Sequence, residues 1–312
     1  MRAVPLGSTG VTVSEVVYGA GSIGGFGSAP QTRGWGLTAD DGTRQLDRAA
    51  ARGVRLVDTA DAYAGGESER VVGRWLPAHP DVLVATKVGN VAGGVDLSAG
   101  HIGRQLATSL ARLGRVDLYL THQPDPATPA AETVQTLAGL VAAGTIRGYG
   151  CCNVDRAELD RLLAAADRAG VPGPGWVQNS FNLVDRADER ELLPALAAAG
   201  LGYTPYSPLA GGVLSDRYLG GERPGPRSRV AAGGVAYAYT GAVLARVREL
   251  ARVAAGLEVS TAGLALAWLR RHPGVTAPIV APRTADQWRA VDEALALDLD
   301  DATAGAVGAL FD

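Results

Sequence analysis

The chain has 312 residues, of which 47% are hydrophobic and 20% are charged, and its formal net charge is −3. Such a chain can bury a large core, and its weak charge without a basic cluster argues against nucleic acid or an anionic membrane as the main partner. The start lacks the pattern of a signal peptide, and no apolar run approaches the roughly 18 residues of a membrane span. The two cysteines are neighbours in the sequence and make no disulfide framework. We therefore expect a cytoplasmic protein.

The elements expected along the chain alternate between short apolar runs and amphipathic stretches. The apolar runs predict strands over 13–19, 54–59, 82–87, 116–122, 146–151, 176–180, 201–206 and 276–281. Between them, apolar residues recur at spacings of three and four, which predicts helices that include 40–53, 66–76, 101–114, 130–144 and 154–170. Strands that alternate with helices indicate an α/β parallel sheet, and this number of strands favours a closed (β/α)8 TIM barrel, with residues 1–312 as one domain.

The ends and the loops add further features. Residues 1–15 have the pattern of an N-terminal β-hairpin that turns at Ser8, Thr9 and Gly10, and we expect it to cover the bottom of the barrel. Long connections follow the first and the seventh strand, at about 24–38 and 207–239. In a barrel, long loops that follow strands build the active-site side, so these two are expected on the C-terminal face.

The segment GAGSIG at residues 19–24 fits the G-x-G-x-x-G pattern of dinucleotide-binding Rossmann units. That pattern requires a helix that opens on the glycines. Here a long loop, GFGSAPQTRGWG, follows instead. We therefore do not expect a Rossmann domain at this position.

Polar residues gather at the carboxyl ends of the expected strands. They are Asp58 with Tyr63 five residues on, Lys87, His122, Asn153, Gln178, Asn179 and Tyr206. Each alone has an ordinary structural explanation, such as helix capping or core packing. The carboxyl ends of barrel strands converge on one face, however, and substrates bind there. Their recurrence at the same end of successive strands therefore predicts a common site.

The lone lysine gives this site its chemistry. Lys87 is the only lysine in the chain, every other basic residue being arginine, and a lysine is a compact charge whose pKa moves readily when it is buried. A nearby ammonium lowers the pKa of a tyrosine such as Tyr63, and a carboxylate such as Asp58 keeps the ammonium charged. An imidazole such as His122 can donate a hydrogen bond to a carbonyl oxygen. The set forms a proton donor for a carbonyl that receives a hydride. The sequence has no metal-binding motif, so the hydride has to come from an organic cofactor.

Several motifs resemble those of the aldo-keto reductases, in order and over nearly the whole chain. They are DTADAYAGGESERVVG, VATKVG, YLTHQPD, GYGCCN and YTPYSPLAGGVLS. The resemblance implies that Tyr63 is the general acid/base, that Lys87 and Asp58 tune it and that His122 orients the carbonyl. It also implies an NADPH-dependent oxidoreductase that reduces an aldehyde or ketone, or oxidises the corresponding alcohol.

The same resemblance assigns cofactor contacts. Asn153 and Gln178 are expected on the nicotinamide carboxamide, Tyr206 is expected to stack on the ring, and the segment VAPRTADQW is expected on the adenosine phosphate. The full set of expected cofactor residues is Gly21, Ser22, Asp58, Cys152, Asn153, Gln178, Tyr206, Ser207, Leu209, Gly211, Arg217, Arg283 and Gln287. Of these, Ser207, Leu209 and Gly211 are expected to follow the pyrophosphate.

The chain departs from the family pattern at several of these positions. Cys152 stands where serine is usual, Arg217 is the substitute for a usual lysine, and an asparagine is missing around Val291 and Asp292. Arg283 could bind a 2′-phosphate with paired donors, which favours NADP(H) over NAD(H). The sequence stops at Asp312, soon after its last expected helix, so we expect an open substrate pocket.

The substrate is expected to be a small or medium-sized polar carbonyl compound, with a sugar-like compound among the candidates. The loop after the first strand offers Phe26 and Trp35 as ring walls, together with Gln31 and Arg33 as polar contacts, although solvated loop residues are nearly as good an explanation. The residues expected around the substrate are Phe26, Trp35, Tyr63, Asn90, His122 and Gln123.

Other functions are compatible with the same residues. One alternative is a nicotinamide-binding regulatory subunit that resembles the β subunits of potassium channels. Another is a reductase of an activated double bond or of a sugar or sugar-nucleotide intermediate. By the same resemblance, His122 favours carbonyl chemistry over double-bond reduction, whereas the oligomeric state is left open.

Overall fold

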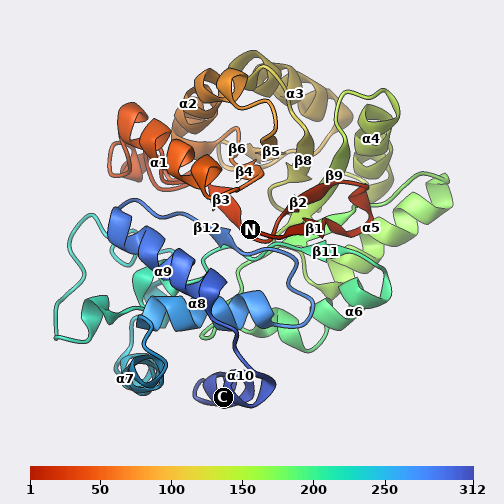
Figure 1. The fold of residues 1–312 in the computed structure, drawn as a ribbon. Helices are drawn as coiled ribbons and strands as arrows, with labels where there is room; N and C mark the ends of the chain where they lie inside the picture. The colour runs from red at the N-terminus through yellow and green to blue at the C-terminus, as the bar shows by residue number, and fades with distance from the viewer.

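The structure is a computed structural model that describes residues 1–312, and its centre is a (β/α)8 barrel (Figure 1). The strands form one parallel eight-stranded sheet in the order β11-β10-β9-β8-β5-β4-β3-β12. Their bounds are β3 (Val17–Gly19), β4 (Leu56–Asp58), β5 (Leu83–Val88), β8 (Leu118–Thr121), β9 (Gly148–Cys152), β10 (Trp176–Gln178), β11 (Gly202–Tyr203) and β12 (Ile279–Val280). Each overlaps one of the apolar runs that predicted it, so the expected fold is confirmed.

The sheet closes on itself between its first and last strands. The amide of Thr276 donates to the carbonyl of Tyr203 at 2.8 Å, and the amide of Ile279 donates to the carbonyl of Pro205 at 2.8 Å. These bonds join the β11 segment to the β12 segment, so neither is left as a free sheet edge with unpaired backbone groups.

The first apolar run, residues 13–19, was predicted as a single strand, and this prediction is wrong. Its first part belongs to β2 (Thr12–Ser14), which pairs antiparallel with β1 (Ala3–Pro5), and the barrel strand β3 begins only at Val17. The Ser14 hydroxyl donates to the Val16 carbonyl at 2.6 Å, and Glu15 pairs with Arg2 at 2.9 Å. Side-chain contacts of this kind turn the chain between two extended pieces, and apolar patterning does not record them.

The N-terminal hairpin turns where it was expected and covers the N-terminal end of the barrel. A short 3-10 turn, η1 (Gly7–Thr9), joins β1 to β2, and Gly10 ends the turn with a φ of +71°. Leu6 is fully buried and packs with barrel residues such as Leu118 and Trp176. Figure 1 shows the hairpin, in dark red, lying across the strands at the front of the view.

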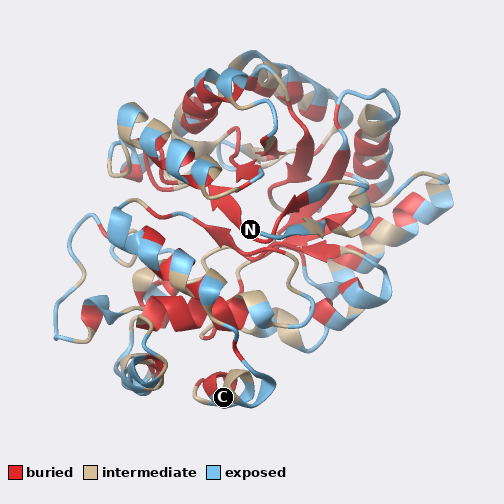
Figure 2. Cartoon of the chain, in the orientation of Figure 1, coloured by how far each residue is buried: buried red, intermediate tan, exposed pale blue.

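Helices surround the barrel, as the periodicity predicted. Their bounds are α1 (Ala39–Ala51), α2 (Glu67–Trp75), α3 (Ala99–Leu113), α4 (Ala130–Ala142), α5 (Arg156–Ala169), α6 (Leu192–Ala198), α7 (Gly241–Gly256), α8 (Thr261–Arg271), α9 (Ala285–Ala296) and α10 (Asp301–Ala309). Figure 2 shows the strands and most of α8 as buried, with α7 and α10 exposed on their outer sides. A helix that is apolar on all sides is usually a buried one, and α8 packs against α7, α9 and α10.

No single helix is both long and apolar enough to cross a membrane. The helices α7 and α8 reach that length and hydropathy only when taken together, and they meet at a bend of 89°.

Long loops follow the carboxyl ends of the strands, where they were expected. The connection after β3 contains the 3-10 turn η2 (Pro30–Thr32) and runs to α1. The connection after β11 contains η6 (Ala210–Gly212), η7 (Asp216–Tyr218) and η8 (Ala236–Ala238). A third excursion, after β5, is a small hairpin of β6 (Asn90–Val91) and β7 (Gly94–Val95).

A pair of glycine substitutions tests how tightly the N-terminal hairpin fits the barrel. Gly7 has a φ of +52°, and a Cβ there would lie 2.1 Å from the amide nitrogen of Gly202. Gly10 has a φ of +71°, but a Cβ there would meet nothing within 4 Å. We expect Gly10→Ala to lower the free energy of unfolding by about 1–2 kcal/mol through backbone strain alone. Gly7→Ala should lower it by roughly 1–3 kcal/mol more, because strain and overpacking add. Equal losses in urea unfolding would contradict the close fit.

Candidate active site

The polar residues of the site are positioned by the alternation of side chains along the strands. Successive strand residues point to opposite faces, so a residue two positions after an inward one also points inward. The barrel interior contains Leu56, Ala85, Leu120 and Trp176. The residues two positions on are Asp58, Lys87, His122 and Gln178. Each strand therefore carries an apolar residue inside the barrel and a polar one directly above it, at the carboxyl end.

Lys87 is the centre of the site. Its side chain is 1% exposed, and its Nζ lies 2.8 and 2.7 Å from the two carboxylate oxygens of Asp58. The same nitrogen donates to the carbonyl of Thr59 at 2.8 Å and lies 3.2 Å from the Tyr63 hydroxyl. Burying an unpaired ammonium would be very unfavourable. These contacts use all of its donors and direct the charge at Tyr63.

Two opposing influences set the pKa of each group in this cluster. Burial by itself lowers the pKa of Lys87, but the neighbouring Asp58 carboxylate raises it, and the result lies above the ordinary value. Burial raises the pKa of Tyr63, and Lys87 lowers it in part. The effect expected of Lys87 is present, but burial outweighs it, so the pKa of Tyr63 lies above its ordinary value. Tyr63 is thus a neutral phenol and Lys87 a cation at neutral pH.

The loop between β4 and α2 holds Tyr63 over the strand ends. The amide of Asp61 donates to the carbonyl of Lys87 at 3.3 Å, and the amide of Ala64 donates to the carbonyl of Gly27 at 3.0 Å. A Cβ at Gly21 would lie 3.2 Å from the Tyr63 ring. Gly21, expected to contact the cofactor, therefore also makes room for the tyrosine.

His122 also packs against Tyr63. The two rings are T-shaped, with centroids 5.6 Å apart. Burial, together with the positive charge of Lys87, lowers the pKa of His122 to about 3. The ring is therefore neutral over the physiological range and carries one proton. Its Nδ1 lies 3.1 Å from the amide nitrogen of Asn90.

A hydrogen-bonded chain links the remaining strand ends. Gln178 donates to Asp58 Oδ1 at 2.9 Å, and its carbonyl lies 3.7 Å from the Cys152 sulfur. Asn153 donates to the carbonyl of His122 at 2.8 Å and accepts from the Tyr206 hydroxyl at 2.7 Å. The structure thus brings together the predicted catalytic residues and the residues predicted to contact the nicotinamide.

Other asparagines at strand ends have structural roles instead. The Asn179 side chain bonds both backbone groups of Val154, at 3.1 and 2.7 Å, and Asn182 donates to the carbonyl of Ser207 at 3.0 Å. The expectation that all polar residues at these positions take part in one site is too broad. A strand end also needs side chains that satisfy the backbone of the loops.

Sequence reasoning missed Arg229, in the long loop after β11. Its guanidinium lies 4.7 Å from the centroid of the Phe26 ring, and that of Arg283 lies 5.3 Å from the same ring. Burial lowers the pKa of both arginines, and the charge of Arg283 lowers that of Arg229 further. Arg217, which acts on Arg283 in the same way, completes the cluster. No ion pair joins Arg217, Arg229 or Arg283 to a carboxylate. The same loop also contains Arg223 and Arg227, so no sequence signal singled out Arg229.

The other predicted cofactor residues lie on the loops around this arginine cluster. Ser22 is buried and its hydroxyl has no hydrogen-bond partner. Ser207 and Gly211 have φ values of +54° and +67°, Leu209 precedes η6, and Gln287 accepts from the amide of Arg283 at 2.7 Å. The start of α9 follows Arg283 directly, with Thr284 as its N-cap.

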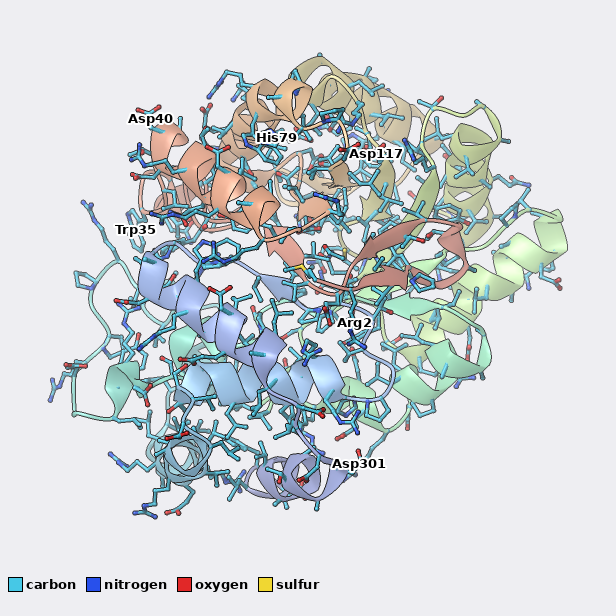
Figure 3. The ribbon with its side chains drawn as sticks, viewed as in Figure 1. Arg2, Trp35, Asp40, His79, Asp117 and Asp301 are labelled. Atoms are coloured by element: carbon cyan, nitrogen blue, oxygen red, sulfur yellow. The ribbon has the colours of Figure 1, made fainter.

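The residues expected around the substrate are dispersed. Phe26 is buried beneath the two guanidiniums, Gln123 is half-buried beside His122, and the amide of Asn90 is directed at His122. Trp35 is half-buried, and Figure 3 places it toward the outer edge of the molecule. No group of three or more His, Cys, Asp or Glu side chains is arranged to hold a metal ion.

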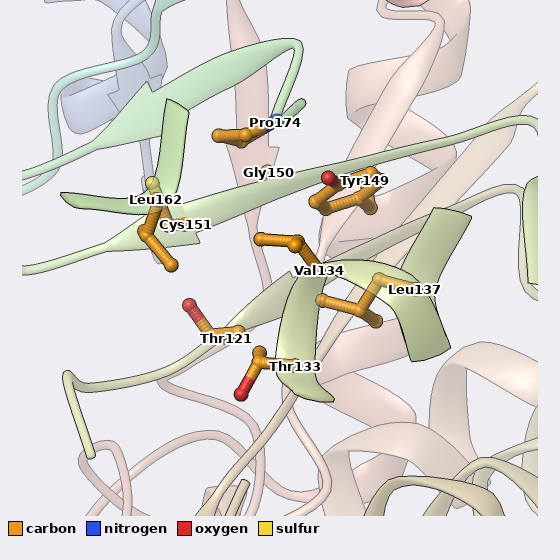
Figure 4. A pocket seen from close by; sticks show the side chains of 9 residues that line it. All are labelled: Thr121, Thr133, Val134, Leu137, Tyr149, Gly150, Cys151, Leu162 and Pro174. Atoms are coloured by element: carbon orange, nitrogen blue, oxygen red, sulfur yellow. The ribbon is translucent and has the colours of Figure 1, made fainter. Parts of the chain in front are cut away.

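Two hollows lie near the site without being part of its centre. The gap drawn in Figure 4 is lined largely by apolar residues of α4 and β9, among them Val134 and Leu137, and has room for about one water molecule. It contains no charged group. A wider, open hollow beside Asn153 is lined by Pro124, Asp155, Glu158 and Arg161, and it adjoins the mouth of the barrel.

Asp61, in the loop that carries Tyr63, is a buried carboxylate without an ion-pair partner. It is 4% exposed, and neither oxygen accepts a hydrogen bond of good geometry, although the Gln105 side chain and the amide of Ala62 lie close to it. Burial, with a smaller contribution from the neighbouring Glu69, raises its pKa to about 7, and Gln105 and the amide of Ala62 offset this only in part. Glu69 itself is paired with Arg112 at 2.9 Å.

The comparisons with known proteins agree with this geometry. A family model described as the aldo/keto reductase family matches residues 15–311. The chain is 31% identical to the probable voltage-gated potassium channel subunit beta of Oryza sativa subsp. japonica, with 96% of this chain and 92% of that protein covered. It is 31% identical to the NADH-specific methylglyoxal reductase of Escherichia coli (strain K12), with 97% and 96% covered. The solved structure of a glycerol dehydrogenase from Gluconobacter oxydans matches with a TM-score of 0.84 at 25% identity, with 99% and 94% covered.

Asp61 predicts a distinct pH dependence of stability. Between its unfolded pKa of 3.8 and its folded pKa of about 7, the folded state binds a proton that the unfolded state does not. This group therefore stabilises the fold fully below pH 3.8, and the stabilisation is lost as the pH rises to 7. Three pKa units correspond to about 4 kcal/mol at most. Asp61→Asn should remove this decline in urea unfolding measured from pH 4 to 8, whereas Asp298→Asn, at an exposed position, should leave it. An unchanged decline in Asp61→Asn would contradict the assignment.

Proposed function

The chain belongs to the aldo/keto reductase family and is an oxidoreductase of that family, and we propose that it reduces the carbonyl group of a small polar aldehyde or ketone with NADPH, or oxidises the corresponding alcohol. The observation that carries the proposal is the neutral Tyr63 hydroxyl, 3.2 Å from the buried Lys87 ammonium and flanked by His122. This is a proton donor placed beside a hydrogen-bond donor, at the end of the barrel where substrates bind.

The reaction requires a hydride on the carbonyl carbon and a proton on the carbonyl oxygen. The nicotinamide ring supplies the hydride when the cofactor is bound. Tyr63 gives its hydroxyl proton to the oxygen, and the Lys87 ammonium stabilises the phenolate that remains. Asp58 keeps that ammonium charged and fixed in place. His122 donates a hydrogen bond to the same oxygen and so orients the carbonyl toward Tyr63. In the alcohol-oxidising direction, the phenolate of Tyr63 takes the proton back.

The residues around the site fit a dinucleotide with two phosphate regions. The buried Ser22 hydroxyl lacks a partner, and the guanidiniums of Arg217, Arg229 and Arg283 lack acidic partners. Arg229 and Arg283 are half-buried and Arg217 is exposed, and partly desolvated cations without acidic partners favour the binding of an anion. Gln178, Asn153 and Cys152 would hold the carboxamide, Tyr206 would lie against the ring, and the loop from Ser207 to Gly211 with Arg229 would follow the pyrophosphate. Arg217, Arg283 and Gln287 would hold the adenosine end.

The choice of NADPH over NADH rests on Arg283. It stands directly before α9, whose first amides also favour an anion. The E. coli relative is named as NADH-specific, so family membership alone does not decide between the two cofactors. An arginine provides the planar pair of donors that a 2′-phosphate requires.

A small polar substrate is favoured by the polar groups at the mouth of the barrel. Gln123 and the exposed Arg33 lie on the loops after β8 and β3. The names of two relatives refer to methylglyoxal and glycerol, which are small and polar. A sugar aldehyde would meet the same requirements. The most direct test is to measure turnover of aldehydes, ketones and sugars of similar size with both cofactors, and a clear preference for flat hydrophobic ketones would contradict this substrate class.

A regulatory role is the second candidate, because the rice relative is named as a potassium channel β subunit. The same turnover measurements separate the two. A regulatory subunit would bind the cofactor and a partner chain without appreciable turnover. The cytoplasmic location and the single-domain organisation stay predictions from the sequence.

We expect Lys87 to be required both for stability and for the chemical step, and a double variant separates these roles. Lys87→Met leaves Asp58 buried without a counter-charge, which typically costs about 3–5 kcal/mol of stability. In Lys87→Met/Asp58→Asn both charges are gone, so stability in urea should largely return. Reduction should stay slower than wild type by about 10²–10⁴ in kcat. Lys87→Arg should fail nearly as badly as Lys87→Met, because a guanidinium cannot serve as the same point charge. Near-normal kcat in Lys87→Arg would contradict the role.

We expect Arg283 to select the cofactor and Arg229 to bind either one. Arg283→Ala should raise KM for NADPH by roughly 10-fold or more and leave KM for NADH nearly unchanged, since a charge-assisted hydrogen bond contributes about 1.5–3 kcal/mol. Arg229→Ala should raise both KM values. The exposed Arg289 on α9 provides the control, and Arg289→Ala should change neither. Equal losses with both cofactors in Arg283→Ala would contradict NADPH selection.

A further inference from the structure

Asn90 is held firmly next to the catalytic face by the small hairpin that follows β5. It lies two residues beyond the end of β5 and pairs with Val95 across the hairpin. Gly89 before it has a φ of +122°, which favours glycine, and the Gly89 carbonyl accepts from the amide of Asp96 at 2.9 Å. The backbone at Asn90 is therefore fixed on both sides, and its side chain is directed at His122.

The contact between Asn90 and His122 defines which nitrogen of the ring bears the proton. The amide nitrogen of Asn90 lies 3.1 Å from Nδ1 of His122. In the orientation that the amide has in the structure, this nitrogen can only donate, so Nδ1 must accept. The neutral ring carries a single proton, which therefore resides on Nε2.

The other groups around the ring are consistent with this state. Lys87 on β5 and Tyr63 in the loop after β4 are the titratable groups that face His122, and neither is an anion. Asn153 on the loop after β9 binds the His122 carbonyl at 2.8 Å, and the amide of His122 donates to the Val88 carbonyl at 2.7 Å. Nε2 has no hydrogen-bond partner within the protein. It is also not fully enclosed by protein atoms, so a ligand can reach it.

We propose that Asn90 is a positioning residue that holds His122 with its proton on Nε2 and aims that N–H at the carbonyl oxygen of the substrate. The inference rests on the function proposed above and deepens it. It replaces the expectation that the Asn90 amide contacts the substrate directly. Asn90 acts through His122, whereas His122 touches the reacting atoms.

The test exchanges the donor at position 90 for an acceptor of nearly the same size. In Asn90→Asp the carboxylate can only accept, so it favours a proton on Nδ1 and takes the donor away from Nε2. At pH 8 we expect kcat to fall by about 10²–10³, the usual loss for one donor to a developing oxyanion. The carboxylate also raises the pKa of the imidazole, and the imidazolium bears a proton on both nitrogens. Activity of Asn90→Asp should therefore recover as the pH falls, relative to wild type.

Two further variants separate this effect from a structural one. Asn90→Leu has a similar size but no polar group, so its kcat should fall without recovering at lower pH. Val91→Ser, at the exposed neighbouring position on β6, should leave kcat and its pH profile unchanged. KM should change less than kcat in both Asn90 variants, because a structural collapse of the pocket would raise KM as well.

Nitrogen NMR of the histidine rings reads the proton position without any substrate. The chain has four histidines, and the spectrum of His122→Gln identifies the His122 signals by their loss. We expect the proton on Nε2 in the wild type, and on Nδ1 or on both nitrogens in Asn90→Asp. A wild-type proton on Nδ1, or an Asn90→Asp variant with unchanged spectrum and pH profile, would overturn the proposal. If no carbonyl compound is turned over, the proposed function fails, and the spectra still decide whether Asn90 fixes the ring.

Discussion

The ion pair of Lys87 with Asp58 is the interaction on which the rest of the site depends. An ammonium that is 1% exposed is tolerated only if its charge and its protons are satisfied. Asp58 on β4, the Thr59 carbonyl and the Tyr63 hydroxyl do this together. Each of them is brought to Lys87 by the pairing of β4 with β5 and by the loop that follows β4. The closed barrel is therefore the condition for a buried cation, and the buried cation is what gives Tyr63 its chemistry.

Much of the fold was accessible from the sequence because each barrel strand is a continuous apolar run. Parallel strands are covered on both faces, so their residues are apolar whichever way they point. The same rule failed at residues 13–19, where Ser14 and Glu15 turn the chain through contacts with residues distant in sequence, such as Arg55 and Arg270. A pattern of local hydrophobicity contains no information on such contacts.

The candidate site could be predicted in part for a related reason. Polar residues that end apolar strands are visible in a sequence, and Asp58, Lys87, His122 and Gln178 were found in this way. Whether a polar residue faces the site or the loop backbone is decided by loop geometry, which is why Asn179 and Asn182 could not be distinguished from Asn153. Arg229 lies in the irregular stretch of its loop between η7 and η8, so no periodicity pointed to it. Its role emerges only from its place over Phe26, next to Arg283.

The charge of Lys87 also determines the protonation of its neighbours. Because the ammonium is retained by Asp58, a second cation beside it is unfavourable, and this adds to burial in lowering the pKa of His122 to about 3. A neutral imidazole has one proton to place, so the group that binds Nδ1 decides whether Nε2 can donate. Burial raises the pKa of Tyr63 while Lys87 opposes it, so the phenol keeps its proton until a reaction draws it away. A single fixed cation thus leaves two neutral donors, the Tyr63 hydroxyl and the His122 ring, facing the same point. In the surrounding loop, the carboxyl group that titrates near neutral pH is that of Asp61, whose side chain does not hydrogen-bond to these residues.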